Sequence, residues 1–340
     1  MIAHVLILLI SFVVILAGSE LFTNAVEWAG HRMDVAEAAV GSLLAAVGTA
    51  LPETFIPAVA ILMGAEGQSE AHHAVGVGAI IGAPLMLSTI ALFVMGMAGI
   101  VYRKRRDRSA LKVSRQDGRR DLAFFFPIFL AAAIVGLGHP GAIARRIIAL
   151  ALLGVYGIYA ATMLRLERSP ESAVEHGLYA ELLMGGSPDA PRGLAIAAQV
   201  IVAMFAILLG AREFVEQVVL LSGHLGLNPG VVSLILSPLA TELPEKYNSV
   251  VWIRQRKDHL ALANITGAMV FQSCIPVSLG LAFTAWHLTP PELLAGGIAL
   301  VSAGLLFVNL REGELGTLSL MVGGAAYAIF LAGLLILGAL

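Results

Sequence analysis

The chain has 340 residues, of which 58% are hydrophobic and only 13% are charged, and its mean hydropathy is +0.88. This composition excludes an ordinary soluble domain, and the net charge of −2 gives no reason to expect a nucleic-acid partner. The single cysteine, Cys274, excludes an internal disulfide and any two-cysteine redox or zinc site. We therefore expect an all-α integral membrane protein that is surrounded by the lipid bilayer.

Apolar stretches of about 20 residues, the length that crosses a ~30 Å hydrocarbon core, recur along the sequence. The first begins at Ile2 without the basic segment of a cleaved signal peptide, so we expect it to remain as a helix. Five such stretches precede the polar segment 165–192 and five follow it. We predict ten transmembrane helices near residues 2–25, 37–64, 73–101, 122–138, 146–164, 194–220, 228–252, 260–286, 291–309 and 316–339.

The basic residues set the expected orientation, because Lys and Arg are retained on the cytoplasmic side of short loops. If both termini face outside, the predicted cytoplasmic loops hold most of the 21 Lys and Arg residues, and the densest group lies in the loop 102–121. That loop could also be a nucleic-acid or phosphoinositide patch, but the orientation rule explains its charge fully. We predict a multi-pass protein of the cell (inner) membrane with both termini outside.

The ten expected helices divide into two sets of five, so the second set enters the membrane with the opposite polarity to the first. Similar halves would then form inverted repeats, an arrangement typical of secondary transporters. We predict a first five-helix repeat at residues 1–164, a cytoplasmic linker at 165–192 and a second, inverted repeat at 193–340.

The two halves share a motif of the form Thr-X-Leu-Pro-Glu, at Thr49–Glu53 in the second predicted helix and at Thr241–Glu245 in the seventh. Within each copy the threonine and the glutamate are four residues apart, so the hydroxyl and the carboxylate lie on one helical face. An ionised carboxylate at membrane depth costs at least ~2.5–3.5 kcal/mol and indicates a functional site.

The proline of each copy adds a backbone oxygen. Because proline has no backbone N–H, Pro52 and Pro244 leave the carbonyl groups of Gly48 and Ala240 without their helical partner. Broken helices at matching places in two repeats are the best sequence pointer to a substrate site near the middle of the membrane. Each half therefore offers a carboxylate, a hydroxyl and a free carbonyl group.

This set of oxygen atoms favours a hard cation such as calcium or sodium over a soft transition metal. Two facing carboxylates repel each other unless a cation or protons lie between them. A purely structural role would require Glu53 and Glu245 to pair with basic residues such as Lys246 or Arg212. Glu53, however, has no intramembrane basic residue near it in its own half.

At these motifs the chain resembles the sodium/calcium exchanger superfamily, whose two inverted repeats carry a motif of the Gly-Thr-Ser-Leu-Pro-Glu type. The resemblance covers essentially the whole chain. It implies ten helices, a site between helices two, three, seven and eight, and exchange by alternating access. It also implies that Glu53 and Glu245 are the central metal ligands and that Thr49 and Thr241 support them.

The family's second element, in helices three and eight, is only partly present. The corresponding stretches are GAIIGAPLML at 78–87 and ANITGAMVFQ at 263–272, in which the close-packing glycines Gly82 and Gly267 match the family pattern. Three sodium ions and one calcium, the exchange that the resemblance implies, need more oxygen ligands than remain. Apolar residues replace the family's polar ligands at Ala83, Leu87 and Ala268.

Glu242 stands where the family usually has serine, and two interpretations of it are open. It can serve as a third carboxylate ligand, or Lys246, four residues later, can neutralise it. Gln272 can contact a bound cation or form a hydrogen bond between helices.

We therefore predict a secondary cation antiporter that exchanges calcium for sodium or protons and has no cofactor besides the transported ions. Crowded carboxylates can also take up protons, so we expect transport to depend on a pH gradient. The nearest alternative is a proton-coupled exchanger of monovalent cations, which the loss of polar ligands favours. An intramembrane enzyme or a non-transporting scaffold would be a different class. The sequence contains no metalloprotease, hydrolase or phosphate-binding motif, so we do not expect an enzyme.

Overall fold

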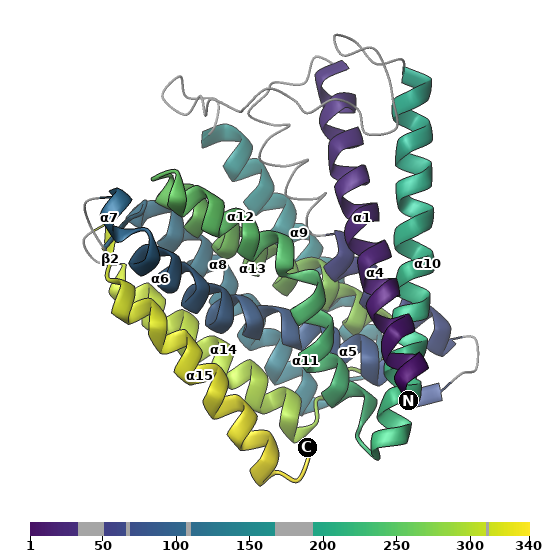
Figure 1. The fold of residues 1–340 in the computed structure, drawn as a ribbon. Coiled ribbons are helices and arrows are strands. Elements are labelled where there is room, and N and C mark those ends of the chain that lie inside the picture. Colours follow the sequence, from purple (N-terminus) through teal and green to yellow (C-terminus); the bar gives the residue numbers. More distant parts are fainter. Residues whose placement is uncertain (33–50, 66–68, 107–109, 167–192, 311–312) are drawn as a thin grey trace.

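The computed structural model describes residues 1–32, 51–65, 69–106, 110–166, 193–310 and 313–340, and these residues form helices and one pair of two-residue strands (Figure 1). The elements are α1 (Ile2–Arg32), α4 (Leu51–Ala65), α5 (Ser69–Met86), the π-helix η2 (Leu87–Ala91), α6 (Leu92–Val101), α7 (Arg103–Arg106), β1 (Leu111–Lys112), α8 (Arg115–Gly138), α9 (Ala142–Leu166), α10 (Gly193–Leu225), α11 (Pro229–Thr241), α12 (Leu243–Arg254), α13 (Asp258–Phe283), α14 (Pro290–Asn309), β2 (Glu314–Leu315) and α15 (Thr317–Ile336).

Within these ranges, eight helical stretches are long and apolar enough to cross a membrane. Two shorter apolar helices, Glu53–Gly64 and Pro229–Thr241, fall in the second and seventh predicted spans. The predicted class, a helical multi-pass membrane protein, is confirmed. The count of ten spans stays a prediction, since residues 33–50 lie outside the described part of the chain.

The seventh predicted span, 228–252, is not one helix. The chain forms α11, breaks at Glu242 and starts again as α12. Pro244 has no backbone N–H to donate across the break, and the Glu242 N–H donates to the Pro238 carbonyl at 3.1 Å. The result is a helix end and a new helix start inside the predicted span.

The third predicted span, 73–101, is continuous but contains the wide turn η2. Pro84 removes one backbone donor shortly before this turn, and nearby hydroxyl groups donate to the carbonyls around it. Ser88 donates to the Pro84 oxygen at 2.8 Å, and Thr89 donates to the Leu85 oxygen at 2.5 Å. Such wide turns mark places where the regular hydrogen-bond ladder is interrupted.

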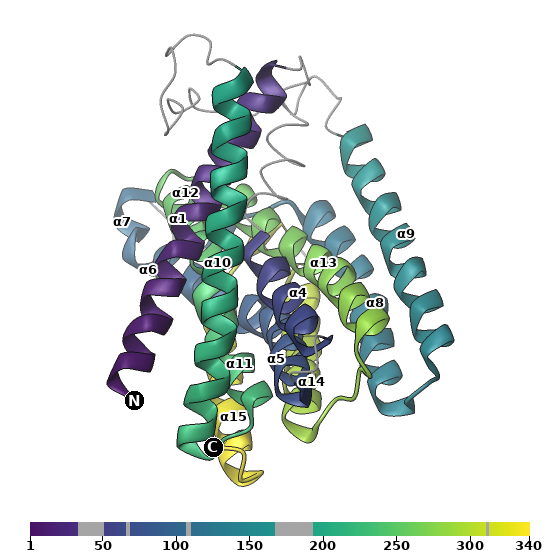
Figure 2. The same cartoon turned by 90° about the vertical axis from the view of Figure 1, so that its right-hand side faces the viewer.

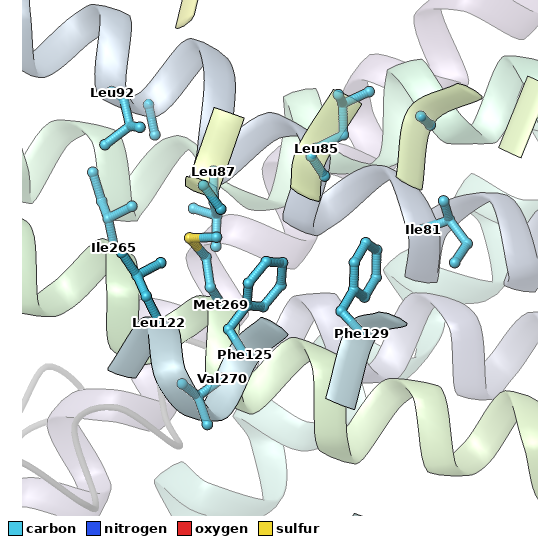
Figure 3. Packing of buried hydrophobic residues seen from close by; sticks show 14 of the residues in the cluster. Ile81, Leu85, Leu87, Leu92, Leu122, Phe125, Phe129, Ile265, Met269 and Val270 are labelled. Atoms are coloured by element: carbon cyan, nitrogen blue, oxygen red, sulfur yellow. The ribbon is translucent and has the colours of Figure 1, made fainter. Parts of the chain in front are cut away.

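The main apolar core lies where α5, η2 and α6 meet α8 and α13, and Figure 3 shows part of it. Two phenylalanine rings of α8, Phe125 and Phe129, stack with centroids 5.1 Å apart. They face side chains from the other elements, among them Leu85, Leu87, Ile265, Met269 and Val270. This core holds the helices around the broken α11–α12 segment.

Glycine allows α5 to approach α11 closely. A Cβ atom on Gly78 would meet the backbone of Gly230, and one on Gly82 would meet the Leu234 carbonyl oxygen. The predicted packing role of Gly82 is thus confirmed. The same role for Gly267 is wrong, because a Cβ there would meet only the Tyr159 hydroxyl, at an ordinary 3.6 Å.

The helices α1 and α10 lie side by side along one flank of the bundle (Figures 1 and 2). Polar groups connect them, since the Gln199 amide donates to the Asn24 side chain at 2.8 Å and to the Leu21 carbonyl at 2.9 Å. These helices are the first of each predicted repeat.

Three loops meet at one end of the bundle. Strand β1 pairs antiparallel with β2, with Leu111 opposite Leu315, and the Lys112 N–H donates to the Asp258 carboxylate at 2.9 Å. These contacts join the segments before α8, before α13 and before α15. All three segments are predicted to be cytoplasmic, so their meeting agrees with the predicted topology.

Candidate cation-binding site

Three buried glutamates from two separate parts of the sequence form one cluster. Glu53, Glu242 and Glu245 are 5%, 0% and 2% exposed. One carboxylate oxygen from each lies within 4.8 Å of the others. The structure therefore brings together the two motif glutamates and places Glu242 beside them.

Each glutamate lies where a helix begins or breaks. Glu53 is the third residue of α4, Glu245 is the third residue of α12, and Glu242 is the residue between α11 and α12. The first N–H groups of a helix have no helical acceptor and give that end a partial positive charge, which favours carboxylates there. The two helix starts thus help the fold to hold negative charge in the membrane.

The prolines of the motif occupy the first turns of these helices. Pro52 and Pro244 are the second residues of α4 and α12, where a missing N–H costs no helical hydrogen bond. In the second half, Ala240 lies in the last turn of α11, and its carbonyl has no N–H donor four residues later because residue 244 is proline. Gly48 lies outside the described residues.

Residues from α11 and α13 surround the cluster. Thr241, the last residue of α11, is buried directly before Glu242. The Gln272 amide of α13 donates to Glu242 Oε1 at 2.6 Å, and the Asn264 amide donates to the Glu245 backbone carbonyl at 3.3 Å. Gln272 thus contacts the cluster through Glu242. Thr49, the matching threonine of the first motif, is outside the described residues.

Several oxygen atoms of the cluster remain without donors. Neither Glu53 carboxylate oxygen accepts a hydrogen bond from another described residue, and the same is true of Glu242 Oε2 and the Gln272 side-chain oxygen. A buried polar group without a partner costs about 1–3 kcal/mol, and more when it is charged. Grouped negative oxygens of this kind are stabilised by cations or protons.

Lys246 adds a positive charge next to the glutamates. Its side chain is 6% exposed, and the ammonium interacts electrostatically with Glu53, Glu242 and Glu245. Nζ donates no hydrogen bond to any residue that the structure describes. Glu242 thus lies in the cluster and also interacts with Lys246, and both interpretations of it stay open. Arg212, the other basic residue considered, is exposed.

Asp121 is a buried acid outside the glutamate cluster that sequence analysis did not identify. Asp121 of α8 is 2% exposed and accepts hydrogen bonds from Thr266 at 2.6 Å and from Tyr159 at 3.2 Å. Arg120 Nε lies 3.5 Å from the same carboxylate. Asp121 directly precedes the predicted span 122–138 and follows two arginines, so its position in the sequence resembled an exposed loop.

Comparisons with known proteins agree on the fold and family. The model of the sodium/calcium exchanger protein family matches residues 3–165 and 195–338. An uncharacterized membrane protein of Methanocaldococcus jannaschii is 24% identical over 327 residues, which is 96% of each chain. Among solved structures, an H⁺/Ca²⁺ exchanger, CAX, has a TM-score of 0.77 at 18% identity, covering 98% of this chain and 82% of its own. The sodium-calcium exchanger NCX_Mj has a TM-score of 0.60 at 20% identity, covering 97% and 98%.

Proposed function

The chain belongs to the sodium/calcium exchanger protein family, and from this premise we propose how it works. It is a membrane cation antiporter and not an enzyme. We propose that it carries calcium in exchange for sodium or protons at the cluster of Glu53, Glu242 and Glu245. The observation that carries this proposal is that three buried carboxylates bring oxygen atoms within 4.8 Å of one another.

The donor set fits a transported calcium ion. Calcium takes oxygen ligands, and carboxylates, carbonyls, side-chain amides and waters all serve. The glutamate oxygens, the side-chain oxygen of Gln272 and the Ala240 carbonyl at the end of α11 provide such atoms. Thr241 lies at the same helix end, and Gly48 and Thr49 are the corresponding residues of the first motif. Both the CAX and NCX_Mj structures are named as calcium exchangers, which supports calcium as the cargo.

We propose that ten membrane spans form two inverted repeats, in which each helix of one half corresponds to one helix of the other half. The helix contacts support this scheme, because contacts between two helices recur between the two corresponding helices. The contact of α5 with α11 corresponds to that of α4 with α13, and the contact of α9 with α13 corresponds to that of α15 with α6. Alternating access would then occur by motion of matched helices around a fixed central site.

The proposed orientation places both termini outside the cell membrane. The three loops joined by β1, β2 and Asp258 then lie on the cytoplasmic side, which is where their basic residues favour them.

One set of observations favours a proton-coupled exchanger of monovalent cations. Ala83 and Leu87 are buried and offer no side-chain oxygen, and Ala268 of α13 offers none. Calcium needs six to eight ligands and would have to keep several waters here. A proton needs only one carboxylate. The same argument favours protons as the counter-ion for calcium.

Flux measurements on the purified protein in proteoliposomes test the proposal. Calcium uptake is measured while a sodium gradient or a pH gradient is imposed, one at a time. We expect calcium flux in both experiments and the larger flux with the pH gradient. Sodium–proton exchange without calcium flux would contradict calcium as the cargo and support the monovalent alternative. Calcium flux that follows sodium and ignores pH would contradict proton coupling.

A further inference from the structure

An open groove lies where the first turns of α8 meet the end of α14. Its volume is about 540 Å³, within the range of roughly 300–1,000 Å³ that small-molecule sites occupy. The lining residues are Arg115, Gln116, Arg119, Arg120, Ala123 and Phe307. Three of them are arginines and none is acidic, so the groove favours an anion.

Two of the three arginines keep their charge available. Arg120 Nη1 lies 3.0 Å from Asp117 Oδ1, so the charge of Arg120 is matched. Arg115 and Arg119 form no ion pair with a carboxylate of the described residues. The Arg119 guanidinium instead lies over the Phe307 ring, 4.1 Å from the ring centroid. This contact orients the guanidinium without adding a negative charge, so two positive charges remain for a bound anion.

The available arginines lie at the depth of the lipid headgroups. The apolar part of the predicted span begins at Leu122, and Arg119 and Arg115 precede it by three and seven residues. At ~1.5 Å per residue they lie about 5 and 10 Å outside the hydrocarbon, measured along the helix axis. The headgroup layer on each side of a bilayer is roughly 5–8 Å thick. The groove therefore opens near the level of the lipid phosphates.

An exposed apolar face continues from the groove along α8. From Arg119 onward the residues of this face recur every three or four positions, which places them on one side of the helix. They are Ala123, Pro127, Leu130, Ile134 and Leu137, and the last three are 49%, 57% and 58% exposed. A ligand with acyl chains can therefore contact both the groove and this face, whereas a free phosphate or a nucleic acid would contact the groove alone.

The orientation rule explains why arginines lie at this end of the bundle, but it does not require them to line one groove. We propose that the groove binds the headgroup phosphate of an anionic phospholipid whose acyl chains lie along α8. Arg115 and Arg119 bind the phosphate, and Phe307 orients Arg119. Because α8 and α14 belong to different predicted repeats, the bound lipid contacts both halves of the chain. The proposal does not depend on which ions the protein exchanges.

Native mass spectrometry of the purified full-length protein in detergent tests the proposal by counting bound lipids during a titration. We expect one phosphatidylglycerol to bind at a half-saturating concentration at least about tenfold below that of phosphatidylcholine, which carries no net charge. Glycerol phosphate at the same concentration should not displace it. Equally tight binding of phosphatidylcholine would contradict recognition of headgroup charge, and displacement by glycerol phosphate would show that the groove binds phosphate without the lipid.

Variants test whether the groove itself is the site. Arg115→Gln combined with Arg119→Gln should raise the half-saturating concentration of phosphatidylglycerol about 30-fold, or about fivefold for each arginine. The matched control, Arg103→Gln with Lys104→Gln, removes two exposed charges that do not line the groove and should change the concentration less than twofold. Phe307→Leu retains every charge and should raise it about two- to fivefold, because the contact with Arg119 is lost.

An equal rise in the control and in the double arginine variant would indicate diffuse attraction to basic residues and overturn the proposal. An unchanged concentration in the double arginine variant would overturn it as well. If that variant does not fold, as judged by its size-exclusion profile, the lipid comparison on the wild type and the Phe307→Leu variant decide the proposal. Absence of calcium flux would contradict the proposed function and leave this result unaffected, because lipid binding is measured without transport.

Discussion

Two of the buried acid groups in the described part of the chain, around Asp121 and around Glu53, differ in how their oxygens are matched. Both Asp121 oxygens accept hydrogen bonds, from Thr266 and Tyr159, and Arg120 lies close by. The cluster around Glu53 instead has several oxygens without a donor from another described residue. Burial of a carboxylate alone therefore does not indicate an ion site, and the grouping of several carboxylate oxygens without donors is what supports the proposed site.

The backbone that carries the two groups of acids also differs, because one group lies on a continuous helix and the other on interrupted helices. Asp121 lies in the continuous helix α8 and connects it to α9 and α13. The glutamates lie at helix starts and at the break between α11 and α12. Continuous helices with matched polar groups hold the bundle together, whereas interrupted helices leave polar atoms available to a substrate.

The largest expected effect comes from removing one charge of the cluster. Glu53→Gln or Glu245→Gln should lower ion-driven flux by about 10–10³-fold, since removing one partner of a buried charge pair weakens binding by about 2–5 kcal/mol. Folding should remain intact, as judged by size-exclusion profile and thermal unfolding. Glu20→Gln, at an exposed position of α1, is the matched control and should transport normally. Full transport by either cluster variant would contradict the site assignment.

Asp121→Asn should produce the opposite pattern. The amide nitrogen cannot accept a hydrogen bond, so one donor from Thr266 or Tyr159 loses its acceptor and the free energy of unfolding falls by about 1–3 kcal/mol. Thermal unfolding measures this loss, and flux per folded molecule should stay within about twofold of the wild type. A large loss of flux at unchanged stability would mean that Asp121 belongs to the transport site. It would contradict the structural role that separates Asp121 from the glutamate cluster.

Gln272→Leu should have a smaller effect, because it removes a neutral partner and leaves all charges in place. Glu242 Oε1 loses the donor that lies at 2.6 Å, and an unmade hydrogen bond to a charged group costs about 1.5–3 kcal/mol. We expect about a tenfold or greater rise in the calcium concentration that gives half-maximal flux. An unchanged half-maximal concentration for Gln272→Leu would exclude Gln272 from the site.

Cysteine labelling tests the predicted orientation of the helices that carry both acid groups. The cysteine substitutions themselves should leave transport unchanged. Single cysteines introduced after Arg105 and after Arg256, in a background that lacks Cys274, should react with an impermeant reagent only from the cytoplasmic side. A cysteine replacing Thr289 should react only from outside. Reversed labelling would overturn the predicted orientation, and labelling from both sides would indicate dual insertion.

The sequence predicted the helices better than their interruptions. Long apolar stretches define spans strongly, so the predicted stretches at 260–286 and 291–309 agree closely with α13 and α14. The break at Glu242 and the wide turn η2 depend on which hydrogen bonds replace the missing proline N–H groups, and residue type alone does not specify that.

Sequence analysis predicted only part of the side-chain contacts in the two acid groups. The repeated motif placed Glu53 and Glu245 together, because identical spacing in two inverted halves is information that a single sequence contains. Spacing indicated that Lys246 and Glu242 share a helical face, but it could not show that the buried lysine interacts electrostatically with Glu53 of the other half as well. The Asp121 group joins α8, α9 and α13, and contacts between helices so far apart in the sequence leave no local pattern.

The strand pair β1–β2 has a mechanical consequence. It connects Leu111 of the first half to Leu315 of the second, and Lys112 next to it is held by Asp258 at the start of α13. At this end of the bundle the two halves are therefore fastened, while the structure describes no such strand at the opposite end. Any motion that opens this end must move the joined segments together as one unit or break the hydrogen bonds between them. Under the proposed alternating access, opening at this end would therefore have to move or break these hydrogen bonds.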